Sequence, residues 1–151
     1  MKIDSINKKI LYLLQKDARM TYKDIANELK RSETTIRDRI KAMERIGIIQ
    51  GYTALINKTA LGLNFFSIIL ANPITSSELD NMTGKIKNVK NVLRVYQISG
   101  EQRLAIFIVT QSYAELKEII RTQLVPLGLR DDKIITVLEA DREFISPLEI
   151  P

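Results

Sequence analysis

The sequence contains no cysteine, no histidine and no tryptophan among its 151 residues. Without cysteine neither a disulfide framework nor a thiolate metal site can form. Without histidine the chain lacks the commonest metal ligand and the commonest general base, so we expect no metal site and no cofactor. No apolar run approaches the ~20 residues of a membrane-spanning helix, and the start, MKIDSINKKI, is too charged for a secretory signal. We therefore expect a cytoplasmic protein without a membrane partner.

The excess of positive over negative charge is confined to the first third of the chain. Residues 1–56 hold 12 Lys and Arg against 7 Asp and Glu, and the remaining 11 basic residues are matched by 11 acidic ones, so this segment carries the whole net charge of +5. Such asymmetry indicates a basic module that meets a polyanion, joined to an electrically balanced module with another role. Hydrophobic residues make up 45% of the chain, which is enough to build a buried core.

Three short helical patterns follow one another in the basic module. The first begins near Ser5, the second at Thr21, which forms a capping-box pattern with Asp24, and the third at the N-cap residue Ser32. Each has an apolar stripe at helical spacing: Ile6, Ile10, Leu13 and Leu14; Ile25, Ala26 and Leu29; Ile36, Ile40 and Met43. Two helices joined by a two-residue turn, with another packed behind, describe a helix-turn-helix. After Gly47, the apolar and β-branched residues 48–56 predict an extended wing and a connecting strand.

The balanced module alternates between strand and helix patterns. Helices are expected from Thr75 and Ser112, since Thr75 with Glu78 and Ser112 with Glu115 are capping-box patterns. Apolar runs predict strands over residues 65–71, 92–98, 104–109 and 133–138. The order β-α-β-β-α-β is the split βαβ, ferredoxin-like arrangement.

The strands of this predicted sheet are nearly continuous apolar runs, so both faces of the sheet need to be covered. Two helices cover only one face, and the other would expose more apolar surface than monomers usually do. A second copy of the same sheet is the simplest cover and gives a two-fold homodimer. The alternative is that the connecting strand or the C-terminal tail, FISPLEIP, covers that face within one chain.

The third helix of the basic module has two interpretations. On a helical wheel Thr34, Arg37, Asp38, Lys41 and Arg45 lie opposite the apolar stripe, which is the ordinary solvated face of an amphipathic helix. The same features suit a recognition helix, because short polar side chains in the first turn can approach base edges in the major groove. In that interpretation Arg37 is placed for a guanine edge, and the flanking cations, Lys30, Arg31, Lys41 and Arg45, contact phosphates. In that interpretation the Asp38 carboxylate accepts a hydrogen bond from a cytosine amino group, or it pairs with Arg37 or Lys41.

The first sixty residues resemble the N-terminal domain of the Lrp/AsnC (feast/famine) transcription regulators. The matching motifs are Ile3-Asp4, Ile10-Leu11 to Leu14, Asp17-Ala18-Arg19, Ile25-Ala26, Ser32 with Thr35-Ile36 and Arg39-Ile40, Gly47 to Tyr52, and Leu61-Gly62. Val92 to Gly100 (VLRVYQISG) is similar to a motif in the family's second domain. The resemblance implies an α+β protein with a DNA-binding helix-turn-helix domain at residues 1–50, a connecting strand and linker at 51–64, and a ferredoxin-like ligand-sensing and oligomerisation domain at 65–151.

The resemblance also implies partners and site residues. The expected partners are double-stranded DNA, a second copy of the chain in a homodimer that assembles to a tetramer or octamer, and an amino-acid effector. The DNA-binding residues would be Lys30, Arg31, Ser32, Thr34, Thr35, Arg37, Asp38, Arg39, Lys41 and Arg45. The effector-binding residues would be Ser99, Gly100, Glu101 and Arg103.

Two segments of the second module depart from the family pattern. Many amino-acid-responsive members have G-D-x-D where this chain has Gly100-Glu101-Gln102-Arg103, and an arginine disfavours the amino group of a simple amino acid. Arg103 is compatible with an acidic effector, with lost ligand sensing, or with an ordinary charged hairpin. Residues 130–132, RDD, stand where the family often has a turn before the last strand.

Two other functions are compatible with this architecture. The sirohaem decarboxylases look like the same two-module arrangement, but they rely on histidines and this chain has none. No other catalytic constellation stands out, so we expect no enzyme activity. The second alternative is a non-catalytic small-molecule sensor or adaptor whose helix-turn-helix contacts a protein.

Overall fold

The computed structural model describes residues 3–75, 79–139, 147, 148 and 150, with the side chains of residues 131 and 132 left aside. The chain forms two compact units, residues 1–55 together with 142–151, and residues 56–141. The break at Leu55 and Ile56 falls inside the segment predicted as the connection. The residues from 142 onward group with the first unit, whereas the sequence interpretation placed everything after residue 64 in the second domain.

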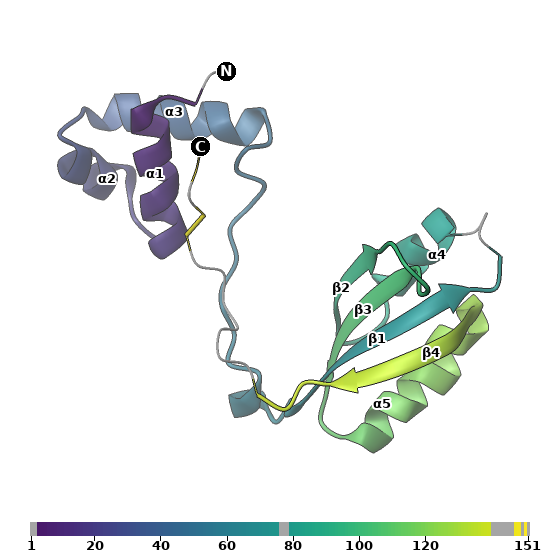
Figure 1. Cartoon of the computed structure of the whole chain (residues 1–151). Coiled ribbons are helices and arrows are strands. Elements are labelled where there is room, and N and C mark those ends of the chain that lie inside the picture. Colours follow the sequence, from purple (N-terminus) through teal and green to yellow (C-terminus); the bar gives the residue numbers. More distant parts are fainter. Residues whose placement is uncertain (1–2, 76–78, 140–146, 149, 151) are drawn as a thin grey trace. The chain divides into compact units, whose positions relative to one another are not determined.

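The first unit is built on three helices, α1 (Ser5–Lys16), α2 (Tyr22–Leu29) and α3 (Glu33–Arg45) (Figure 1). The predicted N-caps are confirmed, because the side chains of Thr21 and Ser32 accept hydrogen bonds from backbone amides of the first helical turn. The apolar stripes meet in one core: Ile10, Ile25, Ala26, Ile36, Ile40 and Met43. Gly47 follows α3 with φ 77°, the left-handed conformation expected after a helix.

The connecting strand predicted after Gly47 does not form in a single chain. Residues 50–57 belong to neither a helix nor a strand, and the sheet of the described residues consists of β1 to β4 without them. Several apolar side chains in this stretch are exposed, among them Tyr52, Leu55 and Ile56. A short 3₁₀ turn, η1 (Thr59–Leu61), then leads into the second unit.

The second unit is the predicted ferredoxin-like sheet with two helices. Its elements are β1 (Phe65–Pro73), α4 (Leu79–Ile86), β2 (Val92–Gln97), β3 (Leu104–Thr110), α5 (Tyr113–Ile119) and β4 (Leu129–Thr136). The strands are antiparallel in the order β2-β3-β1-β4. After α5 the chain continues through a π-helical turn, η3 (Ile120–Leu124), and a 3₁₀ turn, η4 (Val125–Leu127), before Gly128 ends the run with φ 94°.

In the second unit, the predicted start of α5 can be checked, whereas the predicted start of α4 cannot. The Ser112 hydroxyl accepts from the Glu115 amide at 3.2 Å, which confirms the predicted N-cap of α5. The Thr75 and Glu78 capping pattern includes residues outside the described part of the chain. The last strand begins at Leu129, earlier than predicted, because Leu129 and Arg130 pair with Pro73 and Asn72 of β1.

Both helices of the second unit pack on one face of the sheet. Met82 and Ile86 of α4 and Leu116 and Ile119 of α5 share a core with apolar residues of β1 and β3: Ile69, Ala71, Leu104, Ile106 and Ile108. Because side chains alternate along a strand, the neighbours of these residues point to the other face. That face, called the open face below, contains the half-buried Phe66, Ile68, Leu70 and Phe107 and the buried Val109, across β1 and β3.

Candidate nucleic-acid interface

The turn between α2 and α3 fixes where α3 begins. Lys30 adopts the left-handed conformation (φ 50°, ψ 55°), and its amide donates to the carbonyls of Ala26 and Asn27 as the C-cap of α2. The Arg31 amide also donates to the Ala26 carbonyl at 2.9 Å, and the Arg31 guanidinium donates to the Lys30 carbonyl at 3.0 Å. The chain therefore reverses within two residues and exposes both cations immediately before Ser32.

The first turn of α3 is lined with hydroxyl groups. The Ser32 hydroxyl accepts from the Thr35 amide at 3.2 Å and lies 2.7 Å from the Thr35 hydroxyl. The guanidinium of Arg37 donates to the Thr34 hydroxyl at 3.3 Å. These bonds hold Thr34 and Arg37 side by side at the exposed start of the helix, where a helix N-terminus favours anionic groups.

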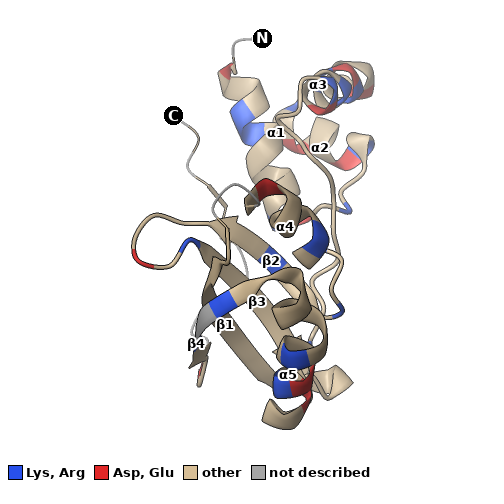
Figure 2. Cartoon of the chain, turned by 90° about the vertical axis from the view of Figure 1, so that its right-hand side faces the viewer, with Lys and Arg blue, Asp and Glu red and all other residues tan. Residues whose placement is uncertain are grey.

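Basic residues recur along α3, with acidic residues between them (Figure 2). Lys41 and Arg45 are exposed, and within the described residues neither has an acidic partner at ion-pair distance. Asp38 is exposed on the same face, and the described structure shows no ion pair from it to Arg37 or Lys41. The structure thus brings together Thr34, Arg37, Asp38, Lys41 and Arg45, as the helical wheel indicated.

Arg39 is placed differently from the other predicted DNA-binding residues. Its Nη1 lies 2.6 Å from an Asp4 carboxylate oxygen and 2.9 Å from the side-chain oxygen of Asn7. Asn7 is almost fully buried, and Asp4 is the N-cap of α1 and accepts from the Asn7 amide at 2.8 Å. Arg39 therefore connects the middle of α3 to the start of α1.

This connection makes Asp4 and Asn7 part of the site, a role that the sequence did not indicate for Asn7 or for Asp4, which was noted only in the Ile3-Asp4 motif. The hydrogen bond from the Asn7 amide, followed by the contact with Arg39, lowers the pKa of Asp4 below its ordinary value of 3.8. The carboxylate is therefore charged near neutral pH and accepts from both α1 and α3. A charged residue followed by a polar residue at the N-terminus of a helix is too common a pattern to have indicated this role.

Tyr52 secures the chain where it leaves α3. Its hydroxyl donates to a carboxylate oxygen of Glu44 at 2.9 Å. Partial desolvation, and then the hydrogen bond to Glu44, raise the pKa of Tyr52 to about 12, although half of the side chain stays exposed. The tyrosine is therefore a neutral donor at physiological pH, and it holds the end of α3 against the following segment.

The four predicted effector residues lie on an exposed hairpin between β2 and β3. Ser99, Gly100, Glu101 and Arg103 are all exposed, and Gly100 has φ 122°. The hairpin is held through its backbone, since the Arg103 amide donates to the Asn72 side chain at 3.0 Å and the Ile98 amide donates to the Arg103 carbonyl at 2.9 Å. One chain presents these side chains together but does not enclose a ligand with them.

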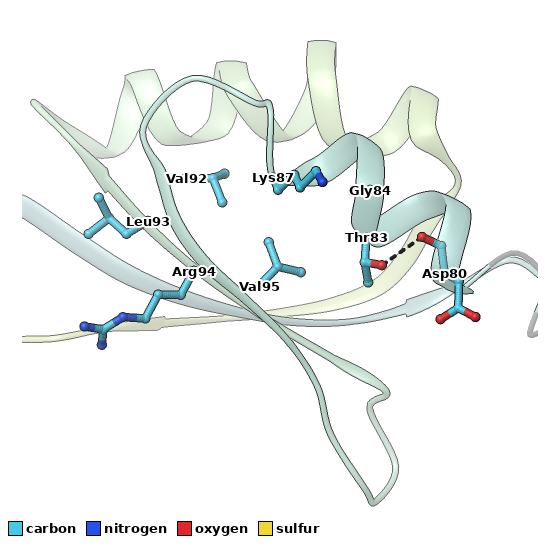
Figure 3. Close-up of a pocket in the computed structure, with 8 residues that line it drawn as sticks. All are labelled: Asp80, Thr83, Gly84, Lys87, Val92, Leu93, Arg94 and Val95. Atoms are coloured by element: carbon cyan, nitrogen blue, oxygen red, sulfur yellow. Dashed lines mark hydrogen bonds between the residues drawn. The ribbon is translucent and has the colours of Figure 1, made fainter. Parts of the chain in front are cut away.

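A separate open cleft of about 430 Å³ lies between α4 and the beginning of β2. Figure 3 shows its lining, which the sequence interpretation did not predict: Asp80, Thr83, Gly84, Lys87, Val92, Leu93, Arg94 and Val95. The Thr83 hydroxyl donates to the Asp80 carbonyl, and the Asp80 carboxylate accepts from the Gln97 amide group at 2.8 Å. The spacing of the three α4 residues Asp80, Thr83 and Gly84 places them on one helical face, but only the fold reveals that β2 lies beside them.

A three-helix unit whose third helix exposes Lys41 and Arg45, followed by a ferredoxin-like sheet, defines a helix-turn-helix DNA-binding protein. The family described as winged helix-turn-helix DNA-binding matches residues 3–50. The transcriptional regulator LrpA of Pyrococcus horikoshii is 35% identical over 122 residues, covering 81% of this chain and 86% of LrpA. The regulator Ptr1 of Methanocaldococcus jannaschii is 31% identical over 142 residues, covering 93% of this chain and 95% of Ptr1. The chain belongs to the Lrp/AsnC family of transcriptional regulators.

Solved structures share the fold of the whole chain. Escherichia coli AsnC has a TM-score of 0.86 at 21% identity and covers 97% of this chain and 100% of its own. A feast or famine regulatory protein of Mycobacterium tuberculosis, solved with L-methionine, has a TM-score of 0.89 at 21% identity and covers 99% and 100%. None of the described helices has the length and apolar character needed to cross a membrane.

Proposed function

We propose that this regulator reads double-stranded DNA with the outer face of α3 and divides the work between two groups of residues. The first turn and Arg37 contact base edges, because Thr34 and Arg37 are held together at the exposed start of the helix. Lys41 and Arg45, together with Lys30 and Arg31 in the preceding turn, bind phosphates and position the helix. The main observation in support of DNA binding is that Lys41 and Arg45 have no acidic partner among the described residues. Arg39 acts indirectly, by holding α3 against α1.

The acting species in this proposal is a two-fold homodimer formed through the open face of the sheet. Phe107 on that face contacts Phe66 and Tyr96, with ring centroids 6.3 Å and 5.6 Å apart. Tyr96 is 49% exposed and Ile135 is 39% exposed, so aromatic and aliphatic surface lies open in one chain. A second copy buries it. Two recognition helices would then read half-sites about 34 Å apart, one turn of DNA, and further dimers would assemble into a tetramer or octamer.

An amino acid or related small metabolite is the proposed effector. Two observations support this proposal. The exposed hairpin of Ser99, Gly100, Glu101 and Arg103 presents charges of both signs. The fold neighbours from Mycobacterium tuberculosis and Neisseria meningitidis were solved with L-methionine. Because one chain leaves the hairpin open, a subunit interface would complete the site. Arg103 favours an effector that carries an additional acidic group.

The division of labour is tested by comparing Arg37→Ala with Lys41→Ala on a library of randomised duplex sites. Arg37→Ala is expected to relax the preference at one position of the half-site, at a cost of about 1–3 kcal/mol on the preferred sequence. Lys41→Ala is expected to weaken all sequences alike and to reduce the salt dependence of binding by about one unit of slope. Identical behaviour of the two variants would overturn the assignment. Salt-insensitive binding to a protein, without any DNA shift, would favour an adaptor instead.

A further inference from the structure

The outward face of α1 is occupied by residues from the far end of the chain. Lys8, Lys9 and Tyr12 line a groove of about 440 Å³ together with Pro147, Leu148 and Ile150. Within it the Leu148 amide donates to the side-chain oxygen of Gln15 at 2.8 Å, across 133 residues of sequence. We call Pro147, Leu148 and Ile150 the docking segment.

The groove is built on the side of α1 that the domain core leaves free. Residues 8, 12 and 15 are spaced i, i+4 and i+7, so they share one helical face. Ile10, which is fully buried, lies on the opposite face. Tyr12 keeps 45% of its surface exposed despite the docking segment, and the ammonium of Lys16 lies 4.5 Å from the centre of its ring.

The docking segment is chemically suited to lie beside Tyr12 and the lysine stems, while the Leu148 side chain stays 67% exposed. Its side chains are apolar, as are the Tyr12 ring and the stems of the two lysines that face it. Its backbone contributes a donor that a proline at position 148 would lack, and Gln15 contributes the matching acceptor. Pro147 restricts the chain before Leu148, which reduces the conformational entropy lost on docking.

We propose that the docking segment lies against the outward face of α1 of its own chain, where it forms one wall of the groove, and gives the DNA-binding domain a second connection to the sheet domain. The chain passes from the first unit to the second after Leu55 and returns to the first after Asp141. Without docking, the helix-turn-helix is attached through residues 50–57 alone, which form no regular structure. With docking, it is attached at both ends, and its freedom to reorient is smaller.

The docking itself is measured on the full-length protein without DNA. Because the chain has no cysteine, Lys16→Cys accepts a single nitroxide label beside the groove. We expect paramagnetic loss of the Leu148 and Ile150 amide signals. Gln15→Met, which removes the acceptor at similar volume, should restore the Ile150 signal, whereas Gln15→Glu, which keeps an acceptor, should not. Full signals in the labelled wild-type chain would overturn the proposal.

A mixed sample identifies which chain the docking segment belongs to. Isotope-labelled protein without the nitroxide is combined with spin-labelled protein at natural abundance and allowed to exchange subunits. Docking within one chain leaves the Leu148 and Ile150 signals of the isotope-labelled protein intact. Their loss would show that the segment occupies the groove of another copy, and that result overturns docking within the chain.

The consequence for DNA binding rests on the proposed function and is measured separately. Leu148→Pro is expected to weaken binding to a duplex with two half-sites by about threefold, the effect of roughly doubling the length of a flexible tether. Binding to a single half-site should not change. Leu138→Pro is the matched control, since Leu138 is 95% exposed and lies before the docking segment. Equal affinities of Leu148→Pro and wild type for the two-half-site duplex would overturn the second connection, whereas an absence of DNA binding by the wild type would refute the proposed function and leave the spin-label result standing.

Discussion

At the scale of single residues, Arg39 determines how α3 meets α1. Replacing it by alanine leaves the side-chain oxygen of Asn7, which is 2% exposed, without its donor. An unpaired buried acceptor costs about 1–3 kcal/mol. We therefore expect Arg39→Ala to lower the free energy of unfolding by that amount, measured by urea denaturation followed by circular dichroism, and to weaken DNA binding because α3 loses its support.

Lys41→Ala is the matched control for this prediction. Lys41 is exposed on the same helix and has no acidic partner among the described residues. Its replacement should change the free energy of unfolding by no more than about 0.5 kcal/mol, while DNA affinity still falls. Equal destabilisation by the two variants would contradict the role given to Arg39.

The Asp4 carboxylate makes the same contact sensitive to acid. Its folded-state pKa is lowered from 3.8, first by the Asn7 amide and then by Arg39. A group with a lowered folded pKa stabilises the fold above its unfolded pKa, and this contribution is lost as pH falls through the folded value. We expect the urea midpoint of the wild type to decline below about pH 4. The midpoint of Asp4→Asn should decline less steeply with falling pH. The hydrogen bonds from Thr21 lower the pKa of Asp24 as well, so the urea midpoint of the variant should still decline somewhat in acid. If the midpoint of Asp4→Asn fell with pH as steeply as that of the wild type, the role given to Asp4 would be refuted.

At the scale of elements, the α2–α3 turn depends on the left-handed Lys30. A non-glycine residue in that conformation costs about 1–2 kcal/mol, and glycine avoids this cost but loses about 0.5–1 kcal/mol more conformational entropy on folding. We expect Lys30→Gly to stabilise the protein by up to about 1 kcal/mol in urea denaturation. The same substitution at the exposed helical residue Lys23 should destabilise it by about 1 kcal/mol. Destabilisation at both positions would show that the Lys30 side chain contributes more than its backbone conformation costs.

The sequence predicted those elements whose signals are local. The N-caps Thr21, Ser32 and Ser112 formed where expected, because each depends on hydrogen bonds within three residues. The apolar stripes became the core of the first unit, since their spacing follows from helix geometry. The outer face of α3 followed from the same periodicity.

Features that depend on distant partners were not predictable in this way. The beginning of β4 is set by its pairing with β1, so the polar Arg130 joins a strand although it resembles part of a turn. The contacts of Arg39 with Asp4 and Asn7 were not predicted, because no local signal shows that these two residues lie within reach. The segment after Gly47 has strand-forming residues but joins no strand among the described residues.

At the scale of the whole molecule, the proposed regulator acts as two copies, and the open face of the sheet is the contact proposed between them. Ile68 lies at the centre of this face, in register with Phe107 on one side and Ile135 on the other. A lysine there would place an unpaired charge from each copy in the interface, at a cost of about 3–5 kcal/mol when such a charge is buried. The same lysine would face water in a single chain.

We therefore expect Ile68→Lys to yield a folded monomer, with a dimer dissociation constant raised at least about a hundredfold in sedimentation velocity. Circular dichroism should show the helical content of the wild type. Leu138→Lys adds the same charge at a side chain that is 95% exposed and lies beyond the end of β4, and it should leave the dimer unchanged. Because two recognition helices would no longer be joined, Ile68→Lys should also lose its advantage for two-half-site DNA over a single half-site. A variant that remains dimeric with an intact fold would show that the subunits associate through another surface.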